Sequence, residues 1–324
     1  MGIIKILITG ASGFIGRNLS FYLCANNPND EIIATDIVVN DIYQNVRSNL
    51  QFECMDILVP EQIRIVFNKH KPDIVVHLAA IASVSPEINE ADIVSTNITG
   101  TINILHACVA NDVKRFVLAS SVAVYGNSYK LPLNITDATS ILTSLYGISK
   151  LACEHCTKLY SDNYGLQSVI LRLSNVYGPT DNSSYGRVVT QFMCKLIYNK
   201  SPYIYGDGSQ TRDFIYIADV IKAIANVVNN ERIADKIFNI ASGESISINE
   251  LFNKIKSITH ATANPVYFDA RLGDINRISL DIEATIADLG WRPETSLDDG
   301  LKQTYNLQLV HADESKRISK LEGL

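Results

Sequence analysis

The 324-residue sequence lacks the features that mark membrane, secreted and disordered proteins. No stretch approaches about 18 consecutive apolar residues, which is the length that a membrane-spanning helix requires. The opening residues, Met-Gly-Ile-Ile-Lys, have neither the basic segment nor the apolar run and cleavage site of a signal peptide. Low-complexity tracts and internal repeats are also absent. The sequence therefore predicts a globular, cytoplasmic protein that does not cross a membrane.

Positive charge and cysteine are both scarce. The chain has 28 Lys and Arg against 34 Asp and Glu, a net charge of −6, which argues against a nucleic-acid partner. Any anionic ligand must then be held by a few local arginines. The six cysteines are spread through the chain, which suits a reducing compartment. Cys153 and Cys156 have the spacing of metal ligands but lack a second pair, so we expect a helical face there and no metal.

Short apolar runs alternate with helical patterns over the first 178 residues, as in a parallel sheet flanked by helices. The predicted strands are 3–9, 31–36, 51–55, 74–77, 115–119 and 168–171. The predicted helices are about 14–26, 60–70, 86–110 and 145–164. The strands are rich in Ile, Leu and Val without polar alternation, which is typical of strands covered on both faces. We therefore expect an α/β fold with a Rossmann-type doubly wound parallel sheet in residues 1–178.

The regular alternation ends after the segment Asn175-Val-Tyr-Gly-Pro179. Beyond it, short strands and helices are separated by turns that contain Gly and Pro. The predicted strands are about 203–206, 236–240 and 265–268, and the predicted helices are about 188–199, 219–229, 247–259 and 298–309. We interpret residues 179–324 as a smaller C-terminal α/β lobe with excursions back to the sheet.

A glycine-rich turn follows the first predicted strand. Gly10, Gly13 and Gly16 have the spacing that lets a backbone turn tightly, approach a pyrophosphate and pack the next helix close to the sheet. The positive end of that helix would face the phosphates. Asp36 ends the second predicted strand, where a carboxylate can accept both ribose hydroxyls and would repel a 2′-phosphate. Because no Arg or Lys follows within residues 37–39, the sequence favours NAD over NADP. A turn without a ligand, and an Asp36 that only ends a strand, are the alternatives.

Tyr146 and Lys150 are four residues apart and therefore share one face of a predicted helix. A free tyrosine has a pKa of about 10, and a tyrosine that acts as a base near neutral pH needs positive charge nearby. The Lys150 ammonium and a nicotinamide ring would supply that charge. Ser121, just after the fifth predicted strand, can donate a hydrogen bond to a substrate oxygen. Together with the glycine turn, these three residues predict hydride chemistry on an alcohol carbon, whereas the Tyr-Lys pair alone would fit a surface helix.

The chain resembles the extended short-chain dehydrogenase/reductase family, and within it the NAD-dependent nucleotide-sugar epimerase/dehydratase branch. The motifs that carry the resemblance span almost the whole chain: Thr9–Gly16, His77-Leu-Ala-Ala80, Asn97, Ser120-Ser-Val-Ala-Val-Tyr-Gly126, Tyr146–Lys150, Arg172-Leu-Ser-Asn-Val-Tyr-Gly-Pro179, Gly206-Asp-Gly-Ser-Gln-Thr-Arg-Asp213 and Arg271-Leu-Gly-Asp274. The resemblance implies an NAD site made of Gly10, Ser12, Gly13, Phe14, Ile15, Gly16, Asp36, Asp56, Ile57, Leu78, Ala79, Ala80, Asn97, Tyr146, Lys150 and Ser174. Asp56 would lie near the adenine amino group and Ser174 near the nicotinamide.

Two residues after Ser121 distinguish the reactions of this branch. In the 4,6-dehydratases an acid and a base stand here, and UDP-glucuronate decarboxylases tend to carry a Glu in the same segment. This chain has Val122 and Ala123, which transfer no protons. The resemblance therefore implies epimerisation at C4 of a UDP-hexose, in which Tyr146 takes the C4 hydroxyl proton and NAD is regenerated in each turnover.

The resemblance also places the nucleotide sugar. Its contacts would come from Ser83, Ser121, Asn175, Val188, Tyr205, Arg212, Arg271, Asp274 and Ile278. Asn175, Arg212 and Arg271 would hold the diphosphate. Tyr205 would lie against the uracil, Asp274 would accept ribose hydroxyls, Val188 would be near the base, and Ile278 would border the sugar. A local Arg212–Asp213 ion pair and a core role for Tyr205 are the alternatives.

The sugar and the assembly stay open at this point. UDP-glucose/UDP-galactose is the first choice, with UDP-N-acetylhexosamine or UDP-uronate as alternatives, because Ile278 is neither a large aromatic nor a small residue. A nucleotide-sugar 4-ketoreductase or dehydrogenase with net redox is a further alternative; a module that only binds nucleotide would not need Ser121, Tyr146 and Lys150. Relatives dimerise through helices that match 86–110 and 145–164, so a homodimer is expected. Apolar residues there are Ile98, Ile102, Leu105, Leu151 and Leu159. The alternative is that these residues face only the sheet.

Overall fold

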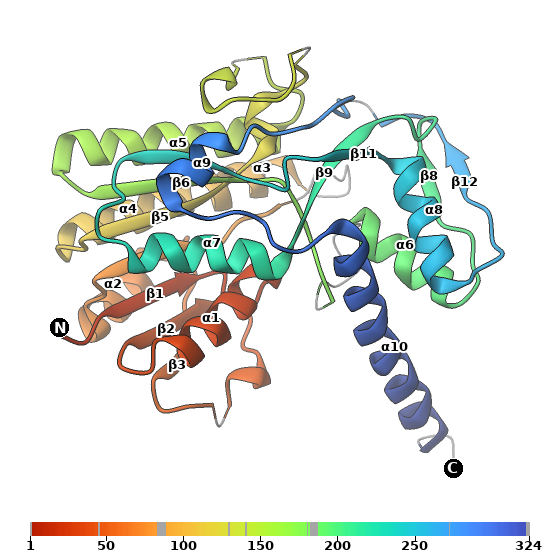
Figure 1. Cartoon of the computed structure of the whole chain (residues 1–324). Helices are drawn as coiled ribbons and strands as arrows, with labels where there is room; N and C mark the ends of the chain where they lie inside the picture. Colours follow the sequence, from red (N-terminus) through yellow and green to blue (C-terminus); the bar gives the residue numbers. More distant parts are fainter. Residues whose placement is uncertain are drawn as a thin grey trace.

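A seven-stranded parallel sheet forms the centre of the protein in the computed structural model (Figure 1). The model describes residues 2–44, 46–82, 89–128, 130–139, 141–179, 181, 187–271 and 273–321, with side chains described up to residue 310. In spatial order the strands are β10 (Lys236–Ile240), β6 (Gln167–Leu173), β5 (Arg115–Ser121), β4 (Ile74–His77), β1 (Lys5–Thr9), β2 (Glu31–Asp36) and β3 (Leu50–Cys54). The strand order reverses between β1 and β4, which is where doubly wound sheets bind their ligands.

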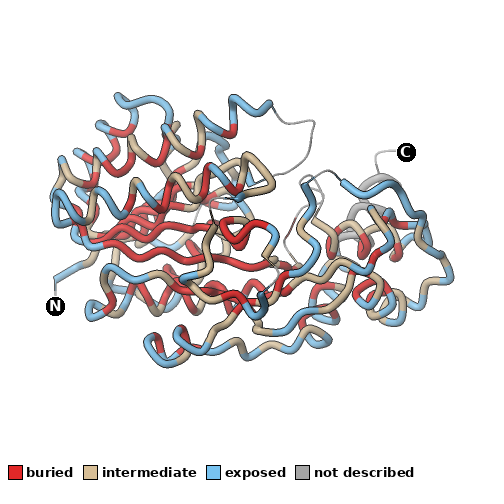
Figure 2. Tube along the Cα trace, turned by 90° about the horizontal axis from the view of Figure 1, so that it is seen from above, coloured by how far each residue is buried: buried red, intermediate tan, exposed pale blue. Residues whose placement is uncertain are grey.

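Helices cover both faces of this sheet. One face packs against α1 (Phe14–Asn26) and α7 (Ile217–Asn229), and the other against α2 (Pro60–His70), α4 (Gly100–Ala110) and α5 (Leu145–Tyr164). Ile6 and Ile8 enter the first core cluster and Leu7 enters the second, because successive side chains of a strand point to opposite faces. Figure 2 shows the buried strands between the two helical layers. The expected Rossmann-type α/β fold is confirmed.

The second half of the chain builds two small sheets beside the main one. A three-stranded sheet contains β11 (Ser245–Ser247), β9 (Thr211–Tyr216) and β7 (Asn175–Tyr177), and a two-stranded sheet contains β12 (Val266–Phe268) and β8 (Tyr203–Tyr205). Helices α6 (Val188–Ile197), α8 (Ile248–Thr259) and α10 (Leu297–Leu321) accompany these small sheets, whereas α9 (Glu283–Leu289) packs against β10 and α7 at the main sheet. Between β9 and β11 the chain returns to the main sheet through α7 and β10 (Figure 1).

The structure departs from the sequence expectations at several elements. The helix expected over 86–110 consists, within its described residues, of α3 (Glu90–Ile93), a π-helical stretch (Val94–Thr99) and α4. Strands β7, β9 and β11 and helix α9 were not expected, because these strands mix polar with apolar residues and the helix spans only seven residues. The run 90–110 is also the one helix in the described part of the chain long and apolar enough to span a membrane. Ile104, Leu105 and Cys108 of this run are buried in the second core cluster, which accounts for much of its apolar composition.

Candidate active site

Two glycines of the glycine turn lie so close to neighbouring protein backbone that nothing larger than hydrogen fits on their Cα atoms. Gly10 has φ +70°, and a Cβ there would lie 2.6 Å from the Ala79 amide nitrogen. A Cβ on Gly16 would lie 2.2 Å from the Gly10 carbonyl oxygen. Helix α1 begins at Phe14 after the N-cap Gly13, which has no side chain to cap the first amide groups. Those amides and the helix dipole are thus available to a diphosphate, so the residues present fit NAD at this turn.

Asp36 lies next to the glycine turn at the carboxyl end of β2. One carboxylate oxygen accepts a hydrogen bond from the Ser12 amide (2.9 Å) and the other from the Val38 amide (3.1 Å). Each oxygen has a further lone pair for a ribose hydroxyl. Asp56 follows the neighbouring strand β3 and accepts from the Leu58 amide (2.8 Å). Ile57 is 6% exposed and packs in the second core cluster, so its side chain supports the fold at this point.

The segment after β4 lies beside the glycine turn. The Ala79 amide donates to the Thr9 hydroxyl (3.2 Å), next to Leu78 and Ala80. Asn97, which the resemblance placed in the NAD site, is 1% exposed. Its side chain accepts from the Ile81 amide (2.8 Å) and donates to the Ser149 hydroxyl on α5 (2.9 Å). Asn97 therefore ties the segment after β4 to the helix that carries Tyr146 and Lys150.

His77 is a site-supporting residue to which sequence reasoning gave no role, although it begins one of the recognised motifs. Its two ring nitrogens lie 2.7 Å from the Thr9 hydroxyl and 3.0 Å from the Thr101 hydroxyl. Burial, together with the nearby Lys150 ammonium, lowers the pKa of His77 to about 3. The imidazole is thus neutral near neutral pH and holds the ends of β1 and β4 together with α4.

The three predicted catalytic side chains come from two adjacent elements. Ser121 ends β5, and its hydroxyl accepts from the Ala123 amide (3.2 Å). Tyr146 lies in the first turn of α5, which Ser144 caps by accepting from the Gly147 amide (3.1 Å). Lys150 is 5% exposed and its Nζ donates to the Ala119 carbonyl of β5 (2.8 Å).

Two further contacts fix the position of α5. A Cβ on Gly147 would lie 2.8 Å from the Ala123 carbonyl oxygen, so the helix approaches the turn after β5 closely. On the other side, the Cys153 thiol of the expected helical face donates to the Asn97 carbonyl (3.0 Å). The helix is therefore held against β5 and against the π-helical stretch.

Val122, in the turn after β5, and Ile278 belong to one small apolar cluster. Val122 is 7% and Ile278 is 3% exposed, and both pack with Tyr125 and Leu280. Ile278 thus contributes mainly packing in this structure and offers little surface to a ligand. Ser83, another of the substrate contacts that the resemblance implies, lies outside the described residues.

Asp213 organises the residues expected to meet the nucleotide. Its carbonyl accepts from the Ser174 hydroxyl (2.5 Å) and from the Asn175 side-chain amide (3.0 Å). Its fully buried carboxylate accepts from the Ser242 amide (2.9 Å) and the Gly243 amide (3.1 Å), and burial raises the pKa of Asp213. The carboxylate contacts backbone amides, so Arg212 does not form the local ion pair with Asp213 that the sequence left open.

Arg212 instead forms an ion pair with Asp274 at 2.5 Å. This pair joins the motifs 206–213 and 271–274, which are both expected to contact the substrate. Arg271 stacks on Tyr205, with its guanidinium carbon 3.9 Å from the ring centroid. Tyr205 is 36% exposed, which is incompatible with a core aromatic. Val188 begins α6 and is half-buried against the first core cluster. The structure thus brings four of the predicted substrate residues together in two pairs, Arg212 with Asp274 and Arg271 with Tyr205.

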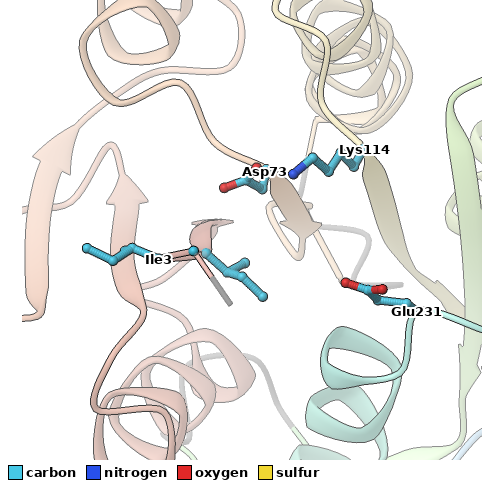
Figure 3. A pocket seen from close by; sticks show the side chains of 6 residues that line it. Ile3, Asp73, Lys114 and Glu231 are labelled. Atoms are coloured by element: carbon cyan, nitrogen blue, oxygen red, sulfur yellow. Dashed lines mark ion pairs between the residues drawn. The ribbon is translucent and has the colours of Figure 1, made fainter.

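A different hollow lies at the opposite, amino-terminal ends of the central strands (Figure 3). Its charged side chains are Asp73, Lys114 and Glu231, and the Lys114 ammonium pairs with the Asp73 carboxylate at 2.8 Å. Ligands of doubly wound sheets bind at the carboxyl ends of the strands. The candidate site is therefore the edge with the glycine turn, Ser121 and α5.

The strand order, the glycine turn and the Ser-Tyr-Lys set define an extended short-chain dehydrogenase/reductase. The family model described as NAD dependent epimerase/dehydratase matches residues 6–241. The chain belongs to this family, and its cofactor is NAD.

Three similar proteins illustrate the range of the family. A protein of Methanocaldococcus jannaschii with a provisional assignment as UDP-glucose 4-epimerase is 37% identical, over 93% of this chain and 97% of the relative. The UDP-glucose 4-epimerase of Thermotoga maritima, solved with UDP-glucose, is 32% identical, with a TM-score of 0.89 over 95% of this chain and 100% of that one. The UDP-glucuronic acid 4-epimerase of Bacillus cereus, solved with its substrate and NAD, is 29% identical, with a TM-score of 0.87 over 95% and 100%.

Proposed function

We propose that this protein catalyses epimerisation at C4 of a UDP-hexose, with UDP-glucose and UDP-galactose as its substrates. The observation that carries the proposal is the contrast at the end of β5. Ser121, Tyr146 and Lys150 provide what reversible oxidation of an alcohol needs, whereas Val122 and Ala123 provide no acid or base for elimination. The relatives with which the chain aligns over nearly its whole length support the same reaction class.

In the proposed mechanism Tyr146 is the proton acceptor and Lys150 supplies the charge that favours its phenolate form. The buried Lys150 ammonium is held by the Ala119 carbonyl, so its position relative to Tyr146 is fixed before substrate binds. Ser121 donates a hydrogen bond to the C4 oxygen and orients it. Bound NAD supplies a reversible hydride acceptor for C4. The proton removed from the C4 hydroxyl resides on Tyr146 and returns to the oxygen after the 4-keto sugar has presented its other face.

The nucleotide part of the substrate is assigned to the second lobe. Arg212 is 12% exposed at its side chain and carries a partner carboxylate, Asp274, so it offers a positioned donor fork for the diphosphate. The side-chain amide of Asn175, which donates to the Asp213 carbonyl, is the second proposed contact of the diphosphate. Tyr205 is exposed on β8 with Arg271 on one ring face, which leaves a cationic aromatic platform for the uracil and phosphate. UDP-N-acetylhexosamine and UDP-uronate are the alternative substrates.

The first test uses the purified protein with UDP-galactose and no added NAD. We expect UDP-glucose to appear, because the cofactor is regenerated in each turnover, and NADH absorbance not to accumulate. Nuclear magnetic resonance of the sugar products reads the result, with UDP-galacturonate and UDP-N-acetylgalactosamine in parallel reactions. Stoichiometric NADH would contradict epimerisation and favour the net redox alternative, and product from only one of the parallel sugars would reassign the substrate.

We further propose a cytoplasmic homodimer that pairs the helices of 90–110 and α5. Leu105 is fully buried and faces the sheet, but Ile148 and Leu159 of α5 are 48% and 54% exposed, and Val94 is 39% exposed. Light scattering should give twice the chain mass of 35.8 kDa. Leu159→Glu should shift the protein toward the monomer, and the control Leu307→Glu, on α10, should not. A wild-type monomer at micromolar concentration would contradict the proposal.

A further inference from the structure

One peptide group of the glycine turn is held at both of its ends. The turn is closed by the Gly13 amide, which donates to the Gly10 carbonyl (3.1 Å), so the Ala11–Ser12 peptide is its central unit. The Ala11 carbonyl accepts a hydrogen bond from the Tyr43 hydroxyl (2.6 Å). The Ser12 amide at the other end of the same peptide donates to Asp36 (2.9 Å).

Tyr43 is held rigidly for this contact. It ends the short 3-10 helix Asp41–Tyr43 and is 8% exposed. Its ring lies between Phe21 of α1, at 5.5 Å and an interplanar angle of 7°, and Phe52 of β3, at 5.0 Å and 28°. Burial raises the pKa of Tyr43 to about 12, so the hydroxyl keeps its proton and donates throughout the neutral range.

The central peptide of a four-residue turn is the unit that rotates when a turn changes type. In the rotated form the third residue takes a positive φ, a region that residues with a Cβ rarely adopt. Ser12 has no such φ here. Rotation would turn the Ala11 carbonyl away from Tyr43 and the Ser12 amide away from Asp36 at the same time. Tyr43 therefore reinforces the turn geometry that sets both the helix N-terminus and the orientation of Asp36.

We propose that Tyr43 is a positioning residue for NAD, which sets cofactor affinity by locking the Ala11–Ser12 peptide of the glycine turn. The peptide links the two parts of the cofactor site, because its amide holds the carboxylate expected to accept the ribose hydroxyls. Ser12 adds a second tie through its hydroxyl, which donates to the Val38 carbonyl (2.6 Å). The segment 36–43, which runs from the end of β2 towards β3, therefore shapes the cofactor site through these contacts. It does so although it contains no Arg or Lys.

The test is Tyr43→Phe, which keeps the stacked ring and removes only the hydroxyl group. We expect the Kd for NAD, measured by isothermal titration calorimetry on nucleotide-free full-length protein, to rise about fivefold to tenfold, as the loss of one buried hydrogen bond implies. Hydrogen exchange in the peptide covering residues 10–16 should become faster. Tyr164→Phe, at a ring 61% exposed on the far end of α5, is the matched control and should leave the Kd unchanged.

A purely structural role would lower the unfolding temperature of the NAD-free protein and leave the Kd of the folded molecules unchanged. An unchanged Kd in folded Tyr43→Phe overturns the proposal. If that variant does not fold, Phe52→Leu keeps the hydroxyl but frees one face of the ring, and its Kd should rise in the same direction; an unchanged Kd there overturns the proposal equally. Because no sugar is present, the result is independent of the proposed epimerase activity.

Discussion

Replacing Tyr146 by phenylalanine is expected to lower kcat for UDP-galactose by between about 10²- and 10⁴-fold, which is the usual contribution of a positioned proton acceptor. The aromatic ring stays in the first turn of α5, capped by Ser144, so the fold of the site is kept. NAD should remain bound, because the glycine turn and Asp36 lie on other elements. The measurements are steady-state epimerisation and the NAD content of the purified variant.

Ser121→Ala and Lys150→Met give the comparison series for this result. Ser121→Ala should lower kcat by a smaller factor than Tyr146→Phe, because it removes an orienting hydrogen bond and leaves the proton acceptor in place. Lys150→Met should lower kcat and also weaken the contact between α5 and the Ala119 carbonyl of β5. Tyr164→Phe serves as the control for loss of a tyrosine hydroxyl on the same helix. Activity near the wild-type level in Tyr146→Phe would show that another group accepts the proton.

Glu154 and Arg172 form a buried ion pair beneath the site, and its loss is expected to have the largest effect on stability. Their side chains are 5% and 4% exposed. Two hydrogen bonds join them, from Arg172 Nε (3.0 Å) and Nη2 (2.7 Å), and Ser120 adds a third to the Glu154 carboxylate (2.5 Å). Arg172 also donates to the Tyr125 hydroxyl (3.0 Å). The network connects α5, one helical turn beyond Lys150, to β5, β6 and the turn after β5.

Glu154→Leu should lower the free energy of unfolding by about 3–5 kcal/mol, because it leaves the Arg172 guanidinium buried without its counter-charge. The double variant Glu154→Leu/Arg172→Met should lose less unfolding free energy than the two single variants lose together, since neither charge is then left buried without its partner. Urea unfolding of the four proteins, analysed as a double-mutant cycle, gives the coupling free energy.

The exposed pair Lys158–Asp162 on the same helix is the matched control, and Asp162→Asn should leave the unfolding free energy nearly unchanged. A fully additive Glu154/Arg172 cycle would show that the two charges do not stabilise each other. A large loss in Asp162→Asn would show that α5 itself, rather than the buried network, limits stability.

The predicted strands of the main sheet agree with the structure to within a few residues at each end. Their apolar runs, such as 6–8 and 116–119, are typical of strands buried on both faces. The prediction failed where a short strand mixes polar with apolar residues, as in β7 and β11, whereas the equally short but apolar β8 and β12 were predicted. It also treated 86–110 as one regular helix, whereas the π-helical stretch there depends on hydrogen bonds that periodicity does not report.

The sequence contains no comparable pattern that predicts contacts between residues far apart along the chain. Nothing in the spacing of Arg212 and Asp274, 62 residues apart, distinguishes their ion pair from the local Arg212–Asp213 alternative. Tyr43 lies 32 residues from the carbonyl that it holds and follows no recognised motif. The apolar Ile278 likewise revealed only its size, whereas its burial with Val122 depends on how two loops meet.

The sequence by itself determined the fold class and the glycine turn for NAD, and it predicted the Ser121, Tyr146 and Lys150 set, because each depends on local spacing along a strand, a turn or a helix. The tertiary structure alone decided which charges pair, which residues are buried beneath the site and which peptide of the turn is locked. These depend on side chains from separate elements, and their meeting is set by the register of strands and the packing of helices. The local sequence pattern therefore indicates which chemical groups are present, and the packing of the elements determines how those groups are positioned.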